Sequence, residues 1–344
     1  MFHPKRKTMS NPNELKREGR YAFLLADAAF KVVICTPENE KLLIEIIELL
    51  LPGKHISSIS FVNKEFHGLV IEEKSSTFDL LCTDKDTGEE FLVELQNEQK
   101  DSFAERIVYY STFLIREQMT TKIKRIREEM EEQLKRGDKP RRIDTMDYSL
   151  RPVYLLCLVD FVLGHNGDDA LEQGYIGRYG ILNRRNGETL TDCWNIVFLE
   201  MGRMRLRPQD KDKCKTLLER FIFSMKYMHL LKERPDGFDD PLLVDLYKAS
   251  ELAAMTVNRR QNYDKVMTNE IDKMCEISFA RKEGEAKGKA EGRAEGRAEG
   301  KAEGKAEGRA EGKAEMAKAL KELGVPADKI SRASGLTPEE IERM

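Results

Sequence analysis

Hydrophobic and polar positions in the first part of the chain follow two different periods. Apolar residues at helical spacing predict helices over 21–33 and 39–51, the second closed by Pro52 and Gly53. Alternation of apolar and polar residues predicts strands. The alternating runs are 55–63, 70–83 and 90–96, with the polar turn DKDTGEE between the last two.

The rest of the pattern is mostly helical. A long helix is predicted from Ser102, apolar on one face at first and almost wholly charged later. The run 151–163 has the continuous apolar character of a buried strand, and a hairpin that turns at Asn186 and Gly187 follows it. Further helices are predicted at about 211–232, 239–257 and 263–283. This order predicts an α/β fold, a mixed sheet flanked by helices, with a C-terminal helical annex.

A tetrapeptide repeat of a cation, Ala, Glu and Gly occupies residues 285–315. It holds eight cations and eight anions, so it is locally neutral and is not a simple tail for neutralising DNA. A glycine inside a helix costs about 0.8–1.0 kcal/mol relative to alanine. Two interpretations follow: a flexible linker, or an oligomerising helix whose Gly and Ala stripes allow close approach in a right-handed supercoil.

The last segment, 316–344, has helical pattern broken by Gly324 and Gly335. Thr337 and Glu340 have the spacing of a capping box at the start of the final helix. Helix, glycine turn and short helix together are typical of a helix-turn-helix. The alternative is a small helical hairpin with a structural or docking role.

Composition narrows the class of protein. The net charge is −3 with 35% charged residues, so no global charge marks a polyanion binder, although a local basic patch is compatible with it. The six cysteines form no CxxC pair, which favours reduced core residues in a cytoplasmic protein and disfavours a zinc site. No apolar window is long enough to span a membrane.

The chain is therefore expected to have five parts. These are a disordered N-terminus at 1–18, a core at 19–205, a helical annex at 206–284, the repeat at 285–315 and the tail at 316–344.

The hairpin predicted over 78–96 carries polar residues inside apolar runs: Asp79 in its first arm, Glu94 and Gln96 in its second. Side chains alternate along a strand, so these three can share one face while the other face is wholly apolar. Adjacent carboxylates repel unless a proton or a cation lies between them. Oxygen ligands without His or Cys favour Mg²⁺. The alternative is the ordinary solvated face of an antiparallel sheet.

An acid, a turn and then Glu-x-Gln on the next strand resemble the PD-(D/E)xK nuclease superfamily in its E-x-Q form. More narrowly, the chain resembles the Rpn family of recombination-promoting nucleases, also described as PD-(D/E)xK family putative transposases. The resemblance covers about residues 20–344 and rests on an ordered set of segments: DAAFK at 27–31, the hairpin, RIVYYSTFL at 106–114, RPVYLLCLVDF, NIVFLEM, LLERFIFSMKYM at 217–228, and the Gly-rich tail.

The resemblance implies a restriction-endonuclease-like core that hydrolyses phosphodiester bonds of double-stranded DNA with Mg²⁺, linked to recombination or mobile elements. Asp79 and Glu94 would bind the metal, with the backbone carbonyl of Leu95 as a further ligand. Gln96 stands where the superfamily usually has Lys. A neutral amide can orient a water or phosphate but supplies no charge, so Lys100, Arg106 or a second metal would supply it.

Further candidate residues are placed by the same resemblance and by helical spacing. Asp27 would be an upstream acid near the site; the alternative is a capping or surface role. Arg106 and Tyr110 are four residues apart and can face the metal together, although a tyrosine on an apolar helix face is often a core residue.

DNA contact needs basic surface, and the candidates lie in KIKRIR: Lys122, Lys124, Arg125 and Arg127. Their alternative role is a solvated helix laced with ion pairs. Two functions remain: a metal-dependent DNA endonuclease, or a catalytically inactive DNA-associated adaptor that forms a homo-oligomer through its repeat tail.

Overall fold

The computed structural model describes residues 19–61, 80–99, 102–137, 148–164 and 171–343, the side chains of Asp27 and Ala28 excepted. The chain divides into two compact units, one ending at Ile271 and the other beginning at Asp272. The predicted N-terminal segment 1–18 and the first part of the strand predicted over 70–83 lie outside the described residues.

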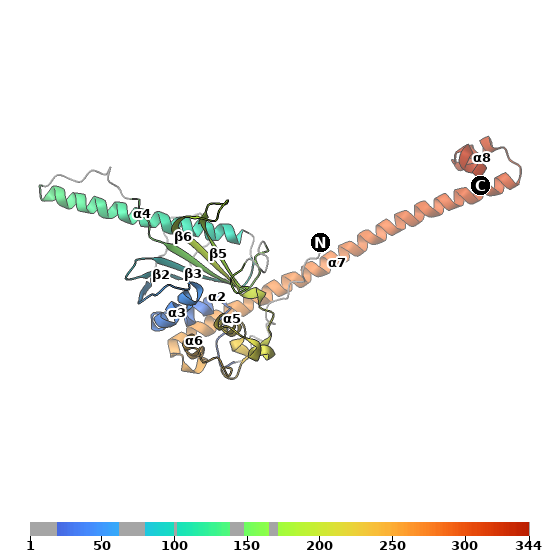
Figure 1. Ribbon diagram of the computed structural model, residues 1–344. Helices are drawn as coiled ribbons and strands as arrows, with labels where there is room; N and C mark the ends of the chain where they lie inside the picture. The colour runs from blue at the N-terminus through green and yellow to red at the C-terminus, as the bar shows by residue number, and fades with distance from the viewer. Residues whose placement is uncertain (1–18, 62–79, 100–101, 138–147, 165–170, 344) are drawn as a thin grey trace. The chain divides into compact units, whose positions relative to one another are not determined.

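A six-stranded mixed sheet forms the centre of the first unit (Figure 1). Its spatial order is β1-β2-β3-β4-β6-β5. The central strands β3, β4 and β6 are parallel, and the outer pairs β1–β2, β2–β3 and β5–β6 are antiparallel. The strands are β1 Ile59–Phe61, β2 Leu80–Asp84, β3 Glu90–Gln96, β4 Val153–Val159, β5 Ile176–Leu182 and β6 Thr189–Glu200. The predicted α/β class is confirmed.

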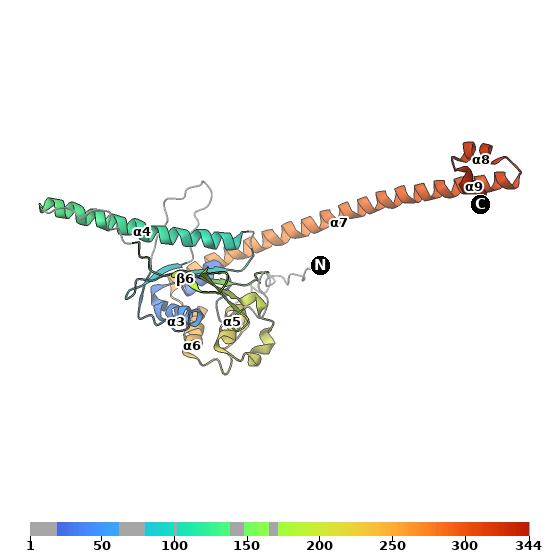
Figure 2. The same cartoon turned by 45° about the horizontal axis from the view of Figure 1, so that its top comes forward.

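Helices cover both faces of this sheet, as Figure 2 shows with the sheet seen nearly edge-on. Helix α4 (Phe103–Lys135) lies on one face. The other face carries α2 (Asp27–Val33), α3 (Glu40–Leu50), α5 (Leu217–Tyr227) and α6 (Pro241–Ser250). Short 3-10 helices are η1 Pro37–Asn39, η4 Met201–Arg203, η5 Pro208–Lys213, η6 Met228–Leu230 and η7 Leu252–Ala254.

The turn between β2 and β3 is specified by its own residues. The Asp84 carboxylate accepts a hydrogen bond from the Asp86 amide at 2.9 Å and one from the Thr87 hydroxyl at 2.9 Å. Gly88 has φ of 69°, and a Cβ there would lie 2.0 Å from the Arg151 guanidinium. The positive φ favours glycine, whereas the Arg151 side chain is flexible enough to move aside. The hairpin predicted around DKDTGEE is confirmed.

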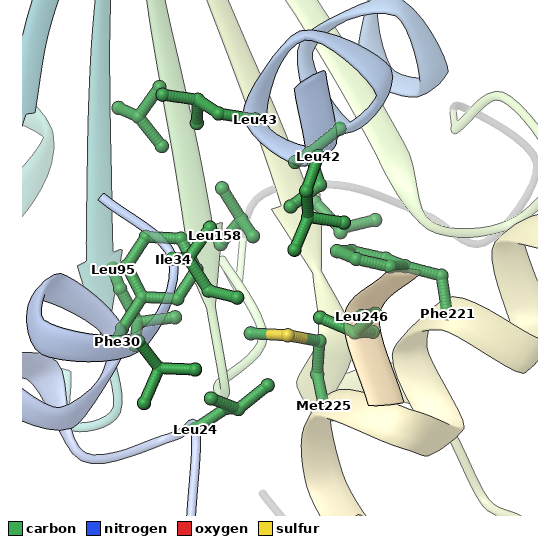
Figure 3. Packing of buried hydrophobic residues seen from close by; sticks show 14 of the residues in the cluster. Leu24, Phe30, Ile34, Leu42, Leu43, Leu95, Leu158, Phe221, Met225 and Leu246 are labelled. Atoms are coloured by element: carbon green, nitrogen blue, oxygen red, sulfur yellow. The ribbon is translucent and has the colours of Figure 1, made fainter. Parts of the chain in front are cut away.

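The larger apolar cluster lies between the sheet and α2, α3, α5 and α6. Leu95 and Leu158 point from β3 and β4 toward Phe30, Phe221 and other buried side chains of these helices (Figure 3). The helices of the predicted annex thus share their core with the sheet. Burial of such side chains stabilises by about 1.5–3 kcal/mol each, so this cluster carries much of the stability.

The segment that precedes α2 differs from its prediction. Residues 21–33 have apolar residues at helical spacing, but the helix begins only at Asp27. The Ala22 amide instead donates to the Ser250 carbonyl at 2.8 Å, and the Leu252 amide donates to the Arg20 carbonyl at 3.0 Å. Long-range backbone pairing replaces the local helix here, because tertiary contacts override a weak helical preference.

The six cysteines are free. Cys82, Cys157 and Cys214 are buried as expected, and burial raises the pKa of the Cys82 thiol to about 12. Cys35 and Cys193 are partly buried. Cys275 is exposed on helix α7, so the prediction of a core position is wrong for this residue.

The second unit contains most of α7 (Val257–Glu322), followed by α8 (Ala327–Ser334) and α9 (Pro338–Arg343). The repeat at 285–315 is part of α7. A small cluster of Ala317, Ile330 and Ile341 joins the end of α7 to α8 and α9. The predicted capping box is present, with the Thr337 amide donating to Glu340 at 2.7 Å and the Glu340 amide to Thr337 at 3.3 Å.

No helix in the described residues is both long and apolar enough to cross a membrane.

Candidate active site

Two of the residues predicted for catalysis, Glu94 and Gln96, lie at the carboxyl end of β3, on the face under α4. Strand alternation places Phe91, Val93 and Leu95 in the larger apolar cluster on the opposite face. Leu92 belongs to the smaller cluster under α4, and Glu94 and Gln96 follow it on that face at intervals of two. The predicted division of the hairpin into an apolar face and a face with polar residues therefore holds.

Asp79 lies just outside the described residues. The described part of the hairpin pairs Leu80 with Val93 and Leu81 with Leu92 in antiparallel register. The role of Asp79 stays a prediction.

Glu94 is a buried acid, 7% exposed. The guanidinium of Arg106, on the first turn of α4, lies 3.6 Å from Glu94, measured from Nη2 to Oε1. The same Nη2 donates a hydrogen bond of 2.8 Å to Oε1 of Gln96. A buried carboxylate is stable when a cation lies beside it, and Arg106 supplies that charge here.

The contact with Arg106 fixes the orientation of the Gln96 amide. A guanidinium has only donors, so the atom of Gln96 that faces it must be the carbonyl oxygen. The amide NH₂ of Gln96 is therefore directed away from Arg106 and remains a donor. Arg106 and Gln96 together present donors and a positive charge where the superfamily has a single Lys.

Arg106 is held between aromatic rings. Its guanidinium carbon lies 5.0 Å from the centre of the Phe103 ring and 5.9 Å from that of Tyr110. Its Nε is buried and has no hydrogen-bond partner among the described residues. An unsatisfied buried donor costs about 1–3 kcal/mol, and the neighbouring Nη2 makes the contacts with Glu94 and Gln96.

The other predicted site residues are placed as follows. Tyr110 is buried in the cluster under α4 and lies beside Arg106, and its role in catalysis stays a prediction. Tyr109 is 51% exposed and does not share that position. Leu95 is buried within β3, and the role of its carbonyl stays a prediction. Asp27 is the first residue of α2; its side chain lies outside the description.

The predicted DNA-contact residues lie in the charged half of α4. Lys122 is partly buried and donates to the Ser149 hydroxyl at 3.2 Å. Lys124, Arg125 and Arg127 are exposed. At about 100° per residue these four cations are spread around the helix, so they form no single basic face.

The donor atoms near the end of β3 determine which metal ion fits there. The described residues hold no group of three His, Cys, Asp or Glu side chains suited to bind a metal ion. The expectation of no cysteine nearby is wrong, because Cys157 of β4 is the register partner of Glu94 on the same face. Glu94 provides a buried carboxylate, and the other donors of β3 on this face are oxygens. Such a donor set fits a hard cation such as Mg²⁺, with Asp79 as its predicted second acid.

Sequence reasoning did not single out two ion pairs near the carboxyl ends of the parallel strands. Asp160, directly after β4, pairs with Lys226 of α5. Glu200, the last residue of β6, is fully buried and accepts hydrogen bonds from Arg203 Nε at 2.7 Å and the Leu163 amide at 3.0 Å. An acid that ends an apolar strand, as in NIVFLE, is the signal that could have indicated the second pair.

A mixed sheet with a parallel centre, helices on both faces and an acid and an amide on a central strand defines a restriction-endonuclease-like α/β fold. The family model for the PD-(D/E)XK nuclease family transposase matches residues 24–280. The chain belongs to this family, a class of nuclease-type proteins associated with mobile elements. The comparisons with curated proteins and with solved structures gave no match.

Proposed function

We propose that this protein is a Mg²⁺-dependent endonuclease that hydrolyses phosphodiester bonds of double-stranded DNA. The observation that carries the proposal is the contact of Arg106 with both Glu94 and Gln96 at the end of β3. The contact gathers a buried carboxylate, an amide and a positive charge at one point of a central strand, and phosphodiester hydrolysis needs groups of these kinds.

Each residue has a distinct part in this reaction. Glu94 and Asp79 would hold Mg²⁺, with the Leu95 carbonyl as a further ligand. The bound cation would supply an activated water and offset the charge that develops on the phosphate. The NH₂ group of Gln96 would orient the attacking water or a phosphate oxygen.

Arg106 would bind a non-bridging phosphate oxygen through the exposed part of its guanidinium, because its side chain is 30% exposed. Its charge would stabilise the pentacovalent transition state, and the position is set in advance by Phe103, Tyr110 and Gln96. Preorganised donors of this kind are each worth about 10²–10³ in rate. Arg106 thus takes over the electrostatic role of the superfamily Lys.

DNA binding would extend from the site along α4. Exposed Lys124, Arg125 and Arg127 are the proposed phosphate contacts, and Lys122 is a weaker candidate because it is already bonded to Ser149. Asp27 is proposed as an upstream acid. Contacts to phosphate carry no sequence information, so low sequence specificity is expected of the core, in a role linked to recombination or mobile elements.

The test is cleavage of supercoiled plasmid by purified full-length protein with Mg²⁺. Wild type is expected to nick or linearise the plasmid, whereas Glu94→Gln, Asp79→Asn and addition of EDTA should each abolish cleavage. Glu117→Gln, on the partly exposed part of α4, is the matched control and should cut like wild type. If intact wild-type protein binds the plasmid without cutting it, the adaptor function replaces this proposal. If Glu94→Gln cuts normally, the site is elsewhere.

A further inference from the structure

The charged half of α4 carries an apolar stripe that does not continue the face packed on the sheet. The stripe consists of Ile123, Ile126, Met130 and Leu134. The sheet-facing residues of the same helix are Ile107, Tyr110 and Leu114. At about 100° per residue, the centres of the two sets lie on opposite sides of the helix. The core formed by the described residues therefore gives no reason for the stripe.

The stripe residues belong to none of the apolar clusters formed by the described residues. In both views α4 continues past the edge of the sheet (Figures 1 and 2). Met119 precedes the stripe, and the spacings from Met119 through Met130 are four, three and four. This is the spacing of a coiled-coil seam, which packs against another helix.

The charges around the stripe are ordered in two blocks. Lys122, Lys124, Arg125 and Arg127 come first, with no acid among them. Glu128, Glu129, Glu131 and Glu132 follow, with no base among them. Two copies aligned in parallel and in register would place like charges together, whereas an antiparallel pair places the basic block of each against the acidic block of the other.

We propose that the charged half of α4 is a self-association surface that pairs antiparallel with a second copy of this chain. A two-fold axis between Ile126 and Arg127 sets Lys122 within two residues of the level of Glu129 of the second copy, and Lys124 within two residues of the level of Glu131. Each of these pairs lies on one flank of the stripe. The same register sets Ile123 at the level of Met130 and Met119 at the level of Leu134. One patch serves both copies, as a two-fold interface requires.

Ion pairs within the helix do not compete strongly with this pairing. Lys124 lies 3.9 Å from Glu128, and Arg136 lies 3.3 Å from Glu132, all with exposed side chains. Exposed pairs at this spacing are worth about 0.2–0.5 kcal/mol. Since a helix rises 1.5 Å per residue, the pairing would hold the two Arg106 positions about 60 Å apart along the helix axis.

Disulfide trapping tests the orientation in the full-length protein. Exposed Cys275 is first replaced by Ser, and this Cys275→Ser chain, which should give no covalent dimer, is the background control. In it, Ile126→Cys lies near the axis and should form a disulfide-linked dimer under mild oxidation. Met119→Cys and Leu134→Cys should each fail to link to themselves but should link to one another when mixed.

The outcomes of this trapping separate the alternatives. Self-linkage at all three positions would show parallel pairing and overturn the proposal. Absence of linkage at position 126 would also overturn it, even if the protein is oligomeric, because the contact would then lie elsewhere, for example in the repeat of α7.

Charge exchange provides an independent test by sedimentation velocity. Lys122→Glu with Lys124→Glu, and Glu129→Lys with Glu131→Lys, should each weaken self-association at least tenfold, and an equimolar mixture of the two variants should restore it. Ile126→Glu should also dissociate the pair. Thr121→Glu, on the other side of the helix from the stripe, is the matched control. Circular dichroism checks that each variant keeps its helix.

A monomeric wild type would refute the pairing. So would variants that sediment like wild type but bind DNA more weakly after loss of the bases, because the basic block would then serve DNA alone.

Discussion

The two faces of the central sheet are built from the same strands but differ in their side chains and in their roles. The face toward α2, α3, α5 and α6 carries a large and almost wholly apolar cluster. The face under α4 has a smaller apolar cluster that gives way to Glu94, Gln96 and Arg106 near the end of β3. The difference shows how a buried charged site can be tolerated: the opposite face supplies the stability that the site does not.

Alternation along β3 is what allows this division. Leu95 packs into the large cluster while its neighbours Glu94 and Gln96 lie on the site face. The acid and the amide are thereby fixed to a backbone that the large cluster anchors. Functional groups on rigid strands are positioned more precisely than groups on loops.

The comparison predicts that large stability losses arise on the helix-rich face without direct loss of catalysis. Phe221 is fully buried there, so Phe221→Ala should lower the free energy of unfolding by about 4 kcal/mol. Urea denaturation measures this loss, and plasmid cleavage by the remaining folded fraction should be near wild type. Ile107→Ala, under α4, should lose less stability but more activity, because it loosens the helix that carries Arg106. If both variants lost activity equally, the prediction that the two faces of the sheet have different roles would be wrong.

On the site face, removal of one charge should lower activity strongly and stability only a little. Arg106→Gln is expected to lower the cleavage rate about 100-fold, equivalent to about 2.7 kcal/mol of transition-state stabilisation. Single-turnover cleavage of a labelled duplex measures it. Arg116→Gln removes an exposed cation two to three turns further along α4 and should leave the rate unchanged. Arg106→Lys keeps the charge without the fork of donors and should lose less.

A second change sharpens the assignment of Arg106. Gln96→Lys in the Arg106→Gln background restores a cation at the position where the superfamily has Lys, and should recover part of the lost rate. If the double variant is as slow as Arg106→Gln alone, the positive charge of Arg106 does not explain its contribution to the rate.

A pH-dependent loss of stability should come from the apolar face. Burial lowers the pKa of His229 to about 4, and neither ring nitrogen has a hydrogen-bond partner among the described residues. The unfolded chain, with an ordinary pKa of about 6.5, binds the proton more readily. Stability from this residue is therefore present above pH 6.5 and is lost as the pH falls toward 4.

Between pH 7.5 and pH 5 this loss should be about 2 kcal/mol, to order of magnitude. His229→Leu should remove it, so the difference between wild type and variant in urea denaturation is compared at the two pH values. The same pH dependence in both proteins would show that His229 is not its source.

Much of the fold was predictable because it depends on local signals. The Gly88 turn, the Pro52–Gly53 stop, the Thr337 cap and strand alternation in the hairpin all act within a few residues. The segment at 21–26 was not predictable, because its backbone partners lie near residue 250. The ion pair of Asp160 with Lys226 joins residues of two distant elements and gave no local signal.

The sequence by itself determined the α/β class, the hairpin and the placing of Glu94 and Gln96 on one face of a strand, because period and turn chemistry are local properties of the chain. Only the tertiary structure decided that Arg106 contacts both Glu94 and Gln96, while its Nε has no hydrogen-bond partner among the described residues. That contact depends on how α4 packs across the sheet, through Ile107, Leu114 and their partners on β3, β4 and β6. Packing of one element on another is set by the whole core, and no single stretch of sequence specifies it.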